Sequence, residues 1–314
     1  MTRIILLEQI KKALDPLKVI RALEEGFVAY SEGRVIVPPV GHLYFEDPPG
    51  DCHIKYGCVP GDESFVVKIA TGFYRNPDIG LPSSNGLMLV FSQKTGRPEA
   101  LLLDEGWLTD ARTAAAGAIA AKHLARSRPA RIGIVGTGTQ ARMQLEWLVH
   151  VTGCRDVTVW GRSGARAEQY RIDMAASGFA VRVASRIEDL CAECDLIVTA
   201  TAARQPLIRA ALLRPGMHIT AVGADGGGKR ELEAGVFKRA DVCVVDSSAQ
   251  CSAYGDSSFA LREGAIAADR LIELGRVIKD PSLGRQNDEQ ITVADLTGVA
   301  VQDIQIANLV LHSL

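Results

Sequence analysis

The sequence predicts an α/β protein with two domains: one built on a Rossmann-type, doubly wound parallel sheet, and a second α+β domain formed by both ends of the chain. Three observations support this fold class. The chain has 314 residues, enough for two ordinary domains. Its first third reads as a helical pattern followed by strands, and from position 131 the rhythm changes to strand–helix alternation. Apolar strands that alternate with helices predict a parallel sheet covered on both faces.

The parallel sheet is predicted from short apolar runs separated by helical patterns. Because six such runs suit a doubly wound fold, we assign 113–290 to this domain. The predicted strands are 131–136, 156–160, 181–184, 195–200, 218–223 and 241–246.

The first third opens with apolar residues at helical spacing over 8–31, where Pro16 is expected to start a second helix and Gly33 to end it. Strands are predicted at 35–37, 64–70, 87–91 and 100–103, and the turn at 94–97 joins the last two as a hairpin. A helix over 107–126 follows. We expect the tail, 291–314, to pack back on this region, so the second domain comprises 1–112 and 291–314.

Composition excludes several classes of function. The net charge of -2 and an aromatic content of 5% give no basic surface for nucleic acid. No apolar run approaches the roughly 20 residues that span a bilayer, so we expect no membrane association. The apolar start is short and soon charged, unlike a signal peptide. Seven scattered cysteines suit a reducing compartment, and we expect a cytoplasmic protein.

Two cysteine groups raise the question of a metal or redox site. Cys191 and Cys194 form a C-x-x-C pair, but no second pair exists and the segment reads as a helix before a strand. Cys52, His53 and Cys58 lack a fourth spaced ligand. We therefore expect no metal.

The strongest single motif is a glycine turn, RIGIVGTGTQA, at 131–141. It has the form G-x-G-x-x-A between a predicted strand and a predicted helix. Gly136 permits the tight turn, Gly138 lets the backbone approach a pyrophosphate, and Ala141 keeps helix and strand close. The helix N-terminus supplies amide groups and a favourable dipole for phosphate. The motif predicts an NAD(P) site; the alternative is a glycine turn in the same fold without a nucleotide.

In such a domain, the residues just after the second strand determine whether NAD or NADP binds. NAD-binding proteins carry a carboxylate there for the ribose hydroxyl, but this chain has Trp160-Gly161-Arg162-Ser163 and no acidic residue. Because Arg162 and Ser163 suit a 2′-phosphate, we favour NADP(H) over NAD(H). The alternative is that Arg162 only faces solvent.

Besides the glycine turn, six further segments have a characteristic order and spacing: FVVKIA (65–70), LPSSNG (81–86), LTDARTAAAG (108–117), AVGADGGGKREL (221–232), ITV (291–293) and GVAVQD (298–303). Together these segments resemble the ornithine cyclodeaminase/mu-crystallin family over nearly the whole chain. This family contains cyclising deaminases, imine reductases, alanine dehydrogenases and the NADPH- and thyroid-hormone-binding mu-crystallin, typically as homodimers.

The resemblance implies roles for individual positions. Lys68 looks like the family lysine beside the substrate carboxylate and amino group, Arg112 like the arginine that contacts substrate carboxylate and cofactor, and Asp225 like the catalytic acid/base. These types suit the chemistry, because arginine holds a carboxylate bidentately and a carboxylate or buried lysine exchanges protons. The alternatives are that Lys68 is a solvated charge at a sheet edge, that Arg112 is an ordinary residue on a helix face, and that Asp225 caps a helix. Further cofactor contacts are implied at Ser84, Thr139, Gln140, Thr201, Val222 and Lys229.

The chain departs from the family pattern where substrate is chosen. Many relatives carry an arginine just after a Pro-Pro pair, but here Pro39 is followed by Val40, and Lys55 is the candidate substitute. Leu296 and Thr297 replace a small polar residue near the nicotinamide. These changes put ornithine in doubt. We expect an NAD(P)-dependent oxidoreductase of a small amino or imino acid. The alternatives are an ornithine cyclodeaminase-like ammonia-lyase using NAD+ and a non-catalytic NADPH- and small-ligand-binding protein.

Overall fold

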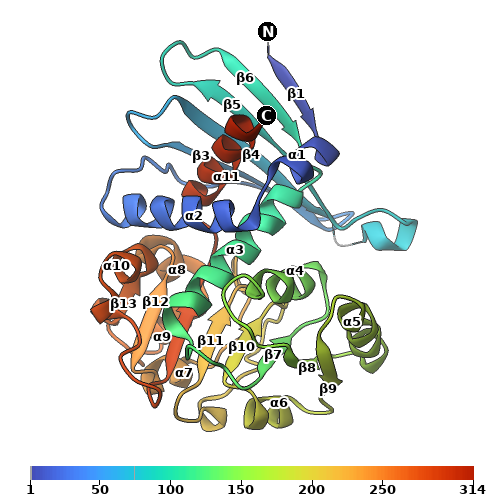
Figure 1. Cartoon of the computed structure of the whole chain (residues 1–314), viewed down its shortest axis with the longest axis vertical. Helices are drawn as coiled ribbons and strands as arrows, with labels where there is room; N and C mark the ends of the chain where they lie inside the picture. The colour runs from blue at the N-terminus through green and yellow to red at the C-terminus, as the bar shows by residue number, and fades with distance from the viewer. Residues whose placement is uncertain (1, 74) are drawn as a thin grey trace. The chain divides into compact units, whose positions relative to one another are not determined.

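The computed structural model describes residues 2–73 and 75–314, and the chain divides into two compact units. Unit 1 comprises Met1–Arg112 and Val299–Leu314, and unit 2 comprises Thr113–Gly298. Helix α3 (Trp107–Leu124) contributes residues to both (Figure 1). Among the described residues, no helix is long and apolar enough to cross a membrane.

Unit 2 is built on an eight-stranded sheet in which every recorded strand pair is parallel. The strand order is β13-β12-β14-β11-β10-β7-β8-β9, so the chain departs from β7 in both directions. The gap between the carboxyl ends of β7 and β10 is thus the switch point at which such sheets bind ligands. The strands are β7 (Ile132–Val135), β8 (Asp156–Trp160), β9 (Ala180–Val183), β10 (Leu196–Thr199), β11 (His218–Ala221), β12 (Val242–Val245), β13 (Leu271–Glu273) and β14 (Thr292–Asp295).

Apolar cores on both faces of this sheet explain its continuous hydrophobic strands. Ile197, Ile219 and Val293 join one buried cluster, whereas Leu196 and Val198 join a second. Because neighbouring residues of a strand point to opposite faces, the two clusters lie on opposite sides of the sheet. The helices are α4 (Thr139–Leu148), α5 (Gly164–Ala176), α6 (Ile187–Glu193), α7 (Ala234–Arg239), α8 (Ser248–Tyr254), α9 (Asp256–Arg262) and α10 (Leu274–Lys279).

Strand β14 corrects the expected boundary of the second domain. We expected 291–314 to belong entirely with the first third, but β14 pairs with both β11 and β12 inside the sheet of unit 2. Only Val299–Leu314 returns to unit 1. A four-residue apolar run after a long polar loop does not reveal which sheet it joins, because periodicity gives the type of an element but not its partner.

Unit 1 contains a six-stranded sheet with the order β1-β6-β5-β4-β3-β2. The β1–β6 pair is parallel and the others are antiparallel. The helices α1 (Leu7–Ala13), α2 (Pro16–Ser31) and α11 (Ala300–Ser313) complete the unit, and α11 packs on α2, β3 and β4. The strands are β1 (Arg3–Leu6), β2 (Gly41–Phe45), β3 (Gly50–Cys58), β4 (Ser64–Phe73), β5 (Ser84–Ser92) and β6 (Pro98–Leu103).

Several local predictions for unit 1 are confirmed. Pro16 is the first residue of α2, and the Asp15 side chain accepts hydrogen bonds from the Leu17 and Lys18 N–H groups. Strands β5 and β6 form the expected antiparallel hairpin.

The strand expected at 35–37 is wrong, because only Ile36 makes an isolated bridge with Cys58. Strands β1, β2 and β3 were not predicted.

Candidate functional site

The central feature of unit 1 is a buried lysine on β4. Lys68 is paired in register with Lys55 of β3 and Met88 of β5, so these three side chains share the helix-covered face of the sheet. Lys68 is 2% exposed and Lys55 is 8% exposed. Lys68 Nζ donates a hydrogen bond of 2.9 Å to Asp303 Oδ1 on α11.

The same carboxylate draws Arg112 into the cluster. Arg112 Nε lies 3.2 Å from Asp303 Oδ1, and its Nη1 donates a 2.8 Å hydrogen bond to Gln302 Oε1. Besides Ser31 Oγ, four buried polar atoms of unit 1 have no hydrogen-bond partner among the described residues: Arg112 Nε, Gln302 Nε2, Asp303 Oδ2 and Asp104 Oδ1. Because most buried polar groups in folded proteins are satisfied, this cluster retains donors and acceptors for a polar ligand.

The electrostatics of the cluster bring the pKa of the Lys68 amine close to neutral pH. Burial, followed by repulsion from Arg112 and Lys55, lowers the pKa of Lys68 to about 7 although Asp303 opposes the shift. Burial would raise the pKa of Asp303, but Lys68, Arg112 and Lys55 outweigh it and hold that pKa below its usual value. Burial also raises the pKa of Asp104, whose Oδ2 accepts the Leu108 N–H at 2.8 Å. The cluster therefore combines fixed positive charge with an amine that exchanges a proton near neutral pH.

The glycine turn of unit 2 has the geometry that a phosphate site needs. Gly136 has φ 125°, and a Cβ there would lie 2.6 Å from the Ala200 carbonyl oxygen, so only glycine fits. A Cβ at Gly138 would meet nothing within 4 Å, which leaves the backbone open. Gly138 precedes α4 without a side-chain cap, and Ala141 is fully buried. The first amide groups of α4 are therefore available to an anion.

The segment after β8 lies against this turn. The Gly136 N–H donates to Trp160 O at 2.9 Å, and a Cβ at Gly161 would lie 2.6 Å from Thr137 Cγ2. Arg162 and Ser163 are both exposed beside it. Ser163 is also the N-cap residue of α5, where its Oγ accepts the Arg166 N–H at 3.4 Å.

Asp225 lies in an irregular segment that follows β11. Its Oδ1 accepts a 2.6 Å hydrogen bond from Lys229 Nζ, and the Asp225 side chain is 56% exposed. No helix forms between 226 and 232. The alternative that Asp225 caps a helix is therefore wrong, and an exposed carboxylate paired with a lysine stands at the carboxyl-end edge of the sheet.

The other predicted cofactor contacts are distributed over both units. Val222 is buried directly after β11, and Thr201 follows β10. Thr139 and Gln140 open α4. Ser84 is an exposed residue at the start of β5 in unit 1.

Two acidic residues of the site were not predicted from the sequence. Asp303 pairs with Lys68 and Arg112, and the available signal was that it is the only acidic residue of the tail segment from 300 to 313. Glu231 is fully buried and accepts hydrogen bonds from Thr199, Thr201 and Gly223. Nothing in its local pattern distinguished Glu231 from a surface acid.

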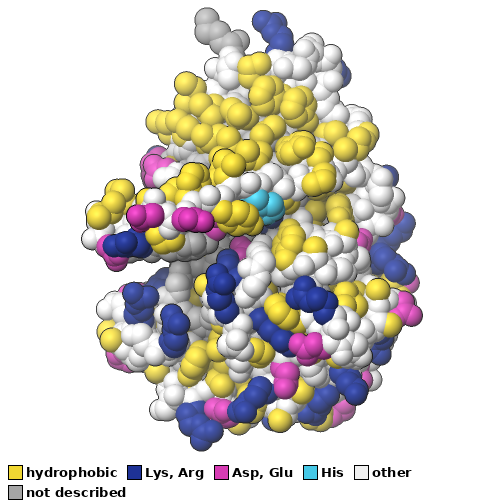
Figure 2. Space-filling view, turned by 180° about the vertical axis from the view of Figure 1, so that it is seen from behind, with side chains coloured by type: hydrophobic (Ala, Val, Ile, Leu, Met, Phe, Trp, Pro, Cys, Tyr) yellow, Lys and Arg dark blue, Asp and Glu magenta, His cyan; other side chains and the backbone are white. Residues whose placement is uncertain are grey.

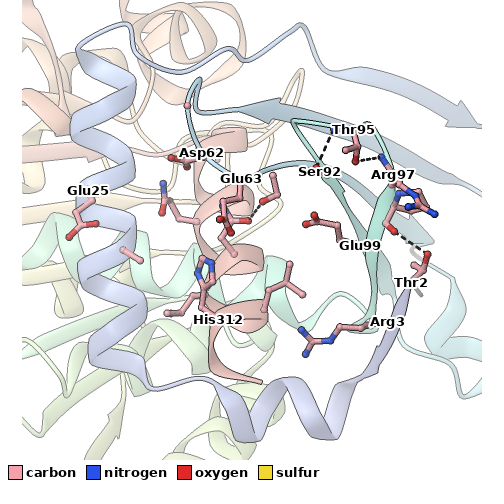
Figure 3. Close-up of a pocket in the computed structure, with 18 residues that line it drawn as sticks. Thr2, Arg3, Glu25, Asp62, Glu63, Ser92, Thr95, Arg97, Glu99 and His312 are labelled. Carbon is pink, nitrogen blue, oxygen red and sulfur yellow. Dashed lines mark hydrogen bonds between the residues drawn. The ribbon is translucent and has the colours of Figure 1, made fainter.

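A cavity of about 1390 Å³ lies elsewhere in unit 1 (Figure 3). It is lined by charged and polar residues of β1, α2, the strand turns and α11, including Arg3, Glu25, Glu99 and His312. None of the predicted site residues lines it. Its carboxylates and guanidinium groups are spread over its wall, so it lacks the focused, buried contacts of the Lys68 cluster.

The cysteine groups do not form a metal centre in the part of the chain that the structure describes. Cys191 and Cys194 are buried free thiols in unit 2. Along β3, Cys52 and Cys58 point to the opposite face from His53, because side chains alternate along a strand. No group of three or more His, Cys, Asp or Glu side chains in the described ranges is arranged to hold a metal ion.

Comparison with known proteins identifies the group to which this architecture belongs. The family model described as "Ornithine cyclodeaminase/mu-crystallin family" matches residues 2–314. The chain belongs to this family. This result confirms the resemblance inferred from the sequence motifs.

Individual family members align over nearly the whole chain. A Sinorhizobium fredii protein described as an uncharacterized cyclodeaminase is 40% identical, covering 93% of this chain and 89% of that protein. An archaeal alanine dehydrogenase dimer with bound NAD is 33% identical with a TM-score of 0.91, covering 99% of this chain and 95% of that one. Thermococcus litoralis Delta(1)-pyrroline-2-carboxylate reductase, in complex with NADH and L-proline, is 28% identical with a TM-score of 0.93 and coverages of 99% and 97%.

Proposed function

We propose that this protein is an NAD(P)-dependent oxidoreductase that transfers hydride at the Cα–N bond of a small amino or imino acid. The observation that carries the proposal is the buried Lys68–Asp303–Arg112 cluster, a set of cations beside unsatisfied polar atoms. Family members that act as an alanine dehydrogenase and an imino acid reductase support the reaction type.

We assign the substrate carboxylate to Arg112 and Lys55. The Arg112 guanidinium is 6% exposed, its Nε lies 3.2 Å from Asp303 Oδ1, and its Nη1 donates a hydrogen bond to Gln302 Oε1. A planar guanidinium binds a carboxylate through two donors at once. Lys55, opposite Lys68 in the β3–β4 register, supplies the second cation in place of the arginine that many relatives carry. These contacts fix the α-carbon, which is the positioning that hydride transfer requires.

We assign proton exchange to Lys68 and Asp225. A pKa of about 7 lets Lys68 donate to, or accept from, the substrate nitrogen at neutral pH. Asp225 is exposed, lies after the carboxyl end of β11 and is anchored by Lys229. We infer that Asp225 receives the second proton of the reaction or activates water.

The glycine turn fits a dinucleotide. Gly136, Gly138 and the first amides of α4 would hold the pyrophosphate, and the bound nicotinamide would supply or accept the hydride. We favour NADP(H) over NAD(H), because Arg162 and Ser163 stand exposed beside the turn and no carboxylate follows β8. The nicotinamide class of cofactor is further supported by the NAD- and NADH-bound family structures.

A cyclodeaminating lyase is the second candidate, because the Sinorhizobium fredii relative is described as a cyclodeaminase. In that reaction a diamino acid would lose ammonia with no net change in the cofactor. We rank this lyase below the oxidoreductase, because the alanine dehydrogenase and the pyrroline-2-carboxylate reductase among the similar structures act as oxidoreductases.

The test is an absorbance assay of NADPH and NADH with purified protein. The panel contains a cyclic imino acid, a dicarboxylic imino acid, and keto acids with ammonia or methylamine. We expect consumption of NADPH with at least one of them. Ammonia release from diamino acids without net cofactor change would establish the lyase instead. Tight NADPH binding with neither activity would establish a binding protein.

We also propose that the protein is a homodimer that pairs through the sheet of unit 1. Along β4, β5 and β6 the residues that point away from the helices stay partly exposed, and most of them are apolar. Ile4, Leu6 and Tyr56 of the same sheet are 62%, 54% and 40% exposed. Figure 2 shows hydrophobic side chains gathered over this unit. Apolar patches of this kind mark protein interfaces, and the archaeal relative is a dimer. Sedimentation should give a dimer, and Leu89→Lys in the middle of the sheet should give a monomer.

A further inference from the structure

We propose that Glu231 is a positioning residue of the cofactor site, which braces the ends of β10 and β11 against each other. The inference rests on the proposed function, because Thr201 and Val222 at these strand ends are proposed cofactor contacts. It assigns a role to a buried carboxylate that touches neither substrate nor cofactor.

The contacts of Glu231 are unusually complete. Oε2 accepts hydrogen bonds from Thr199 Oγ1 at 2.7 Å and the Gly223 N–H at 2.9 Å. Oε1 accepts from the Thr201 N–H at 2.7 Å and Thr201 Oγ1 at 2.6 Å. An ionised carboxylate has about four acceptor sites, so these four donors use its full capacity. An amide or a protonated acid would turn one oxygen position into a donor that faces other donors.

The surrounding backbone is shaped around this carboxylate. A Cβ at Gly223 would lie 2.6 Å from Glu231 Cδ and 2.1 Å from Thr201 O, so the strand ends meet over Glu231 only because position 223 is glycine. The segment after β10 also sets the glycine turn, since a Cβ at Gly136 would lie 2.6 Å from Ala200 O. One carboxylate therefore links the loop after β10, a strand of the switch point at which sheets of this class bind ligands, to the loop after its neighbour β11.

Glu231 is itself rigidly held. Its backbone N–H and that of Leu232 donate to Asp256 Oδ1, each at 2.8 Å, and its carbonyl accepts from Leu207 and Ile208. Burial raises the pKa of Glu231 to about 7, against the effect of its four donors. A buried carboxyl at a strand-end edge whose pKa is shifted toward neutral pH is typical of functional sites rather than of packing.

The test compares Glu231→Gln with Glu233→Gln. Glu233 is two residues away, and its Oε2 accepts only the Ala210 N–H among the recorded hydrogen bonds, at 2.6 Å. Hydrogen exchange of the protein without cofactor is read at 200–203 and 222–225, and the Kd for NADPH and NADH is measured by fluorescence. In Glu231→Gln we expect faster exchange in both segments, at least a tenfold rise in cofactor Kd, and a less than twofold change in KM for the imino substrate. Glu233→Gln should match the wild type.

The two readouts separate the possible failures. Unchanged hydrogen exchange in Glu231→Gln would refute the proposal that Glu231 holds the ends of β10 and β11 together. Faster exchange with an unchanged cofactor Kd would refute the positioning role of Glu231. Absence of cofactor binding by the wild type would overturn the proposed function and the positioning role, while exchange would still report the brace. If Glu231→Gln does not fold, Thr199→Val replaces it, because Thr199 is a fully buried donor to Oε2. That variant should raise the Kd at least threefold, and an unchanged Kd would refute the positioning role.

Discussion

Asparagine at position 303 would leave the shape of the Lys68 cluster almost unchanged but remove its carboxylate charge. Lys68 Nζ lies 2.9 Å from Asp303 Oδ1. At that separation the attraction is roughly 6 kcal/mol with an effective dielectric constant of about 20, before desolvation is counted. Neighbouring charges shift measured pKa values by about 1–3 units. Because Asp303 raises the pKa of Lys68, which stands at about 7, Asp303→Asn should lower that pKa, to about 5 for a shift of about two units.

The assay is the pH dependence of kcat/KM, supported by urea unfolding. Whether the reaction needs the charged or the neutral amine, the ionisation near neutral pH should move to lower pH in Asp303→Asn. Unfolding gives the same information by linkage. The pKa of Lys68 is lower in the folded protein than in the unfolded chain, so the free energy of unfolding rises with pH between these two values. In the wild type this rise begins near pH 7, whereas in Asp303→Asn it begins at the lower pKa of the variant. For a shift of about two units, the variant's deficit should be about 1.3 kcal/mol smaller at pH 8 than at pH 6.

Glu99→Gln is the matched control, because Glu99 is an exposed carboxylate of the same sheet. It should leave both measurements unchanged. An Asp303→Asn variant with the wild-type pH profile, and the same loss of stability at both pH values, would show that Asp303 does not control the Lys68 proton.

Three further predictions concern unit 2. Gly136→Ala should abolish cofactor binding and cost about 1–3 kcal/mol of stability by thermal unfolding, because φ is 125° there. Gly138→Ala should keep or slightly raise stability and should weaken only cofactor binding. Equal effects of the two substitutions would refute the geometry of the turn. Arg162→Ala should raise the KM for NADPH about 10- to 100-fold through loss of a charge-assisted contact of about 1.5–3 kcal/mol, with the KM for NADH unchanged; a parallel rise for both cofactors would exclude Arg162 as the phosphate reader. Burial raises the pKa of Cys191 and of Cys194 to about 12, so mass spectrometry should find neither thiol alkylated at pH 8 until the protein is unfolded, and rapid labelling of the native protein would contradict their burial.

The sequence was most informative where local chemistry sets local structure. The glycine turn was predicted in detail because Gly136 and Gly138 answer steric requirements within a few residues of themselves. Six of the eight strands of unit 2 were predicted. Strands β7, β10 and β12 are buried and mostly apolar runs, whereas β9 is largely exposed. Lys55 was proposed as the substitute for the arginine that many relatives carry after the Pro-Pro pair, and the β3–β4 register sets it opposite Lys68.

The missed features depend on contacts between distant segments. Asp303 reaches Lys68 across 235 positions, and Glu231 reaches Thr199 across 32. A carboxylate in a helical pattern looks the same whether it faces solvent or a buried cation, so neither side chain could be distinguished in the sequence. The same limit concealed β14, whose partners β11 and β12 are decided by tertiary packing and not by propensity.

The position of β14 also bears on how the polypeptide matures during synthesis. The ribosome delivers residues 292–295 after β11, β12 and β13, yet this strand separates β11 from β12 in the finished sheet. Until it emerges, two nascent strands expose unpaired edges, which are templates for aggregation. Residues 300–313 then bring the Asp303 counter-ion of Lys68, so unit 1 also waits for the last helix. A stop codon at or before position 292 would thus leave both units unfinished, because the product would lack β14 as well as α11. Quality control should treat such a product as a failure of the whole chain.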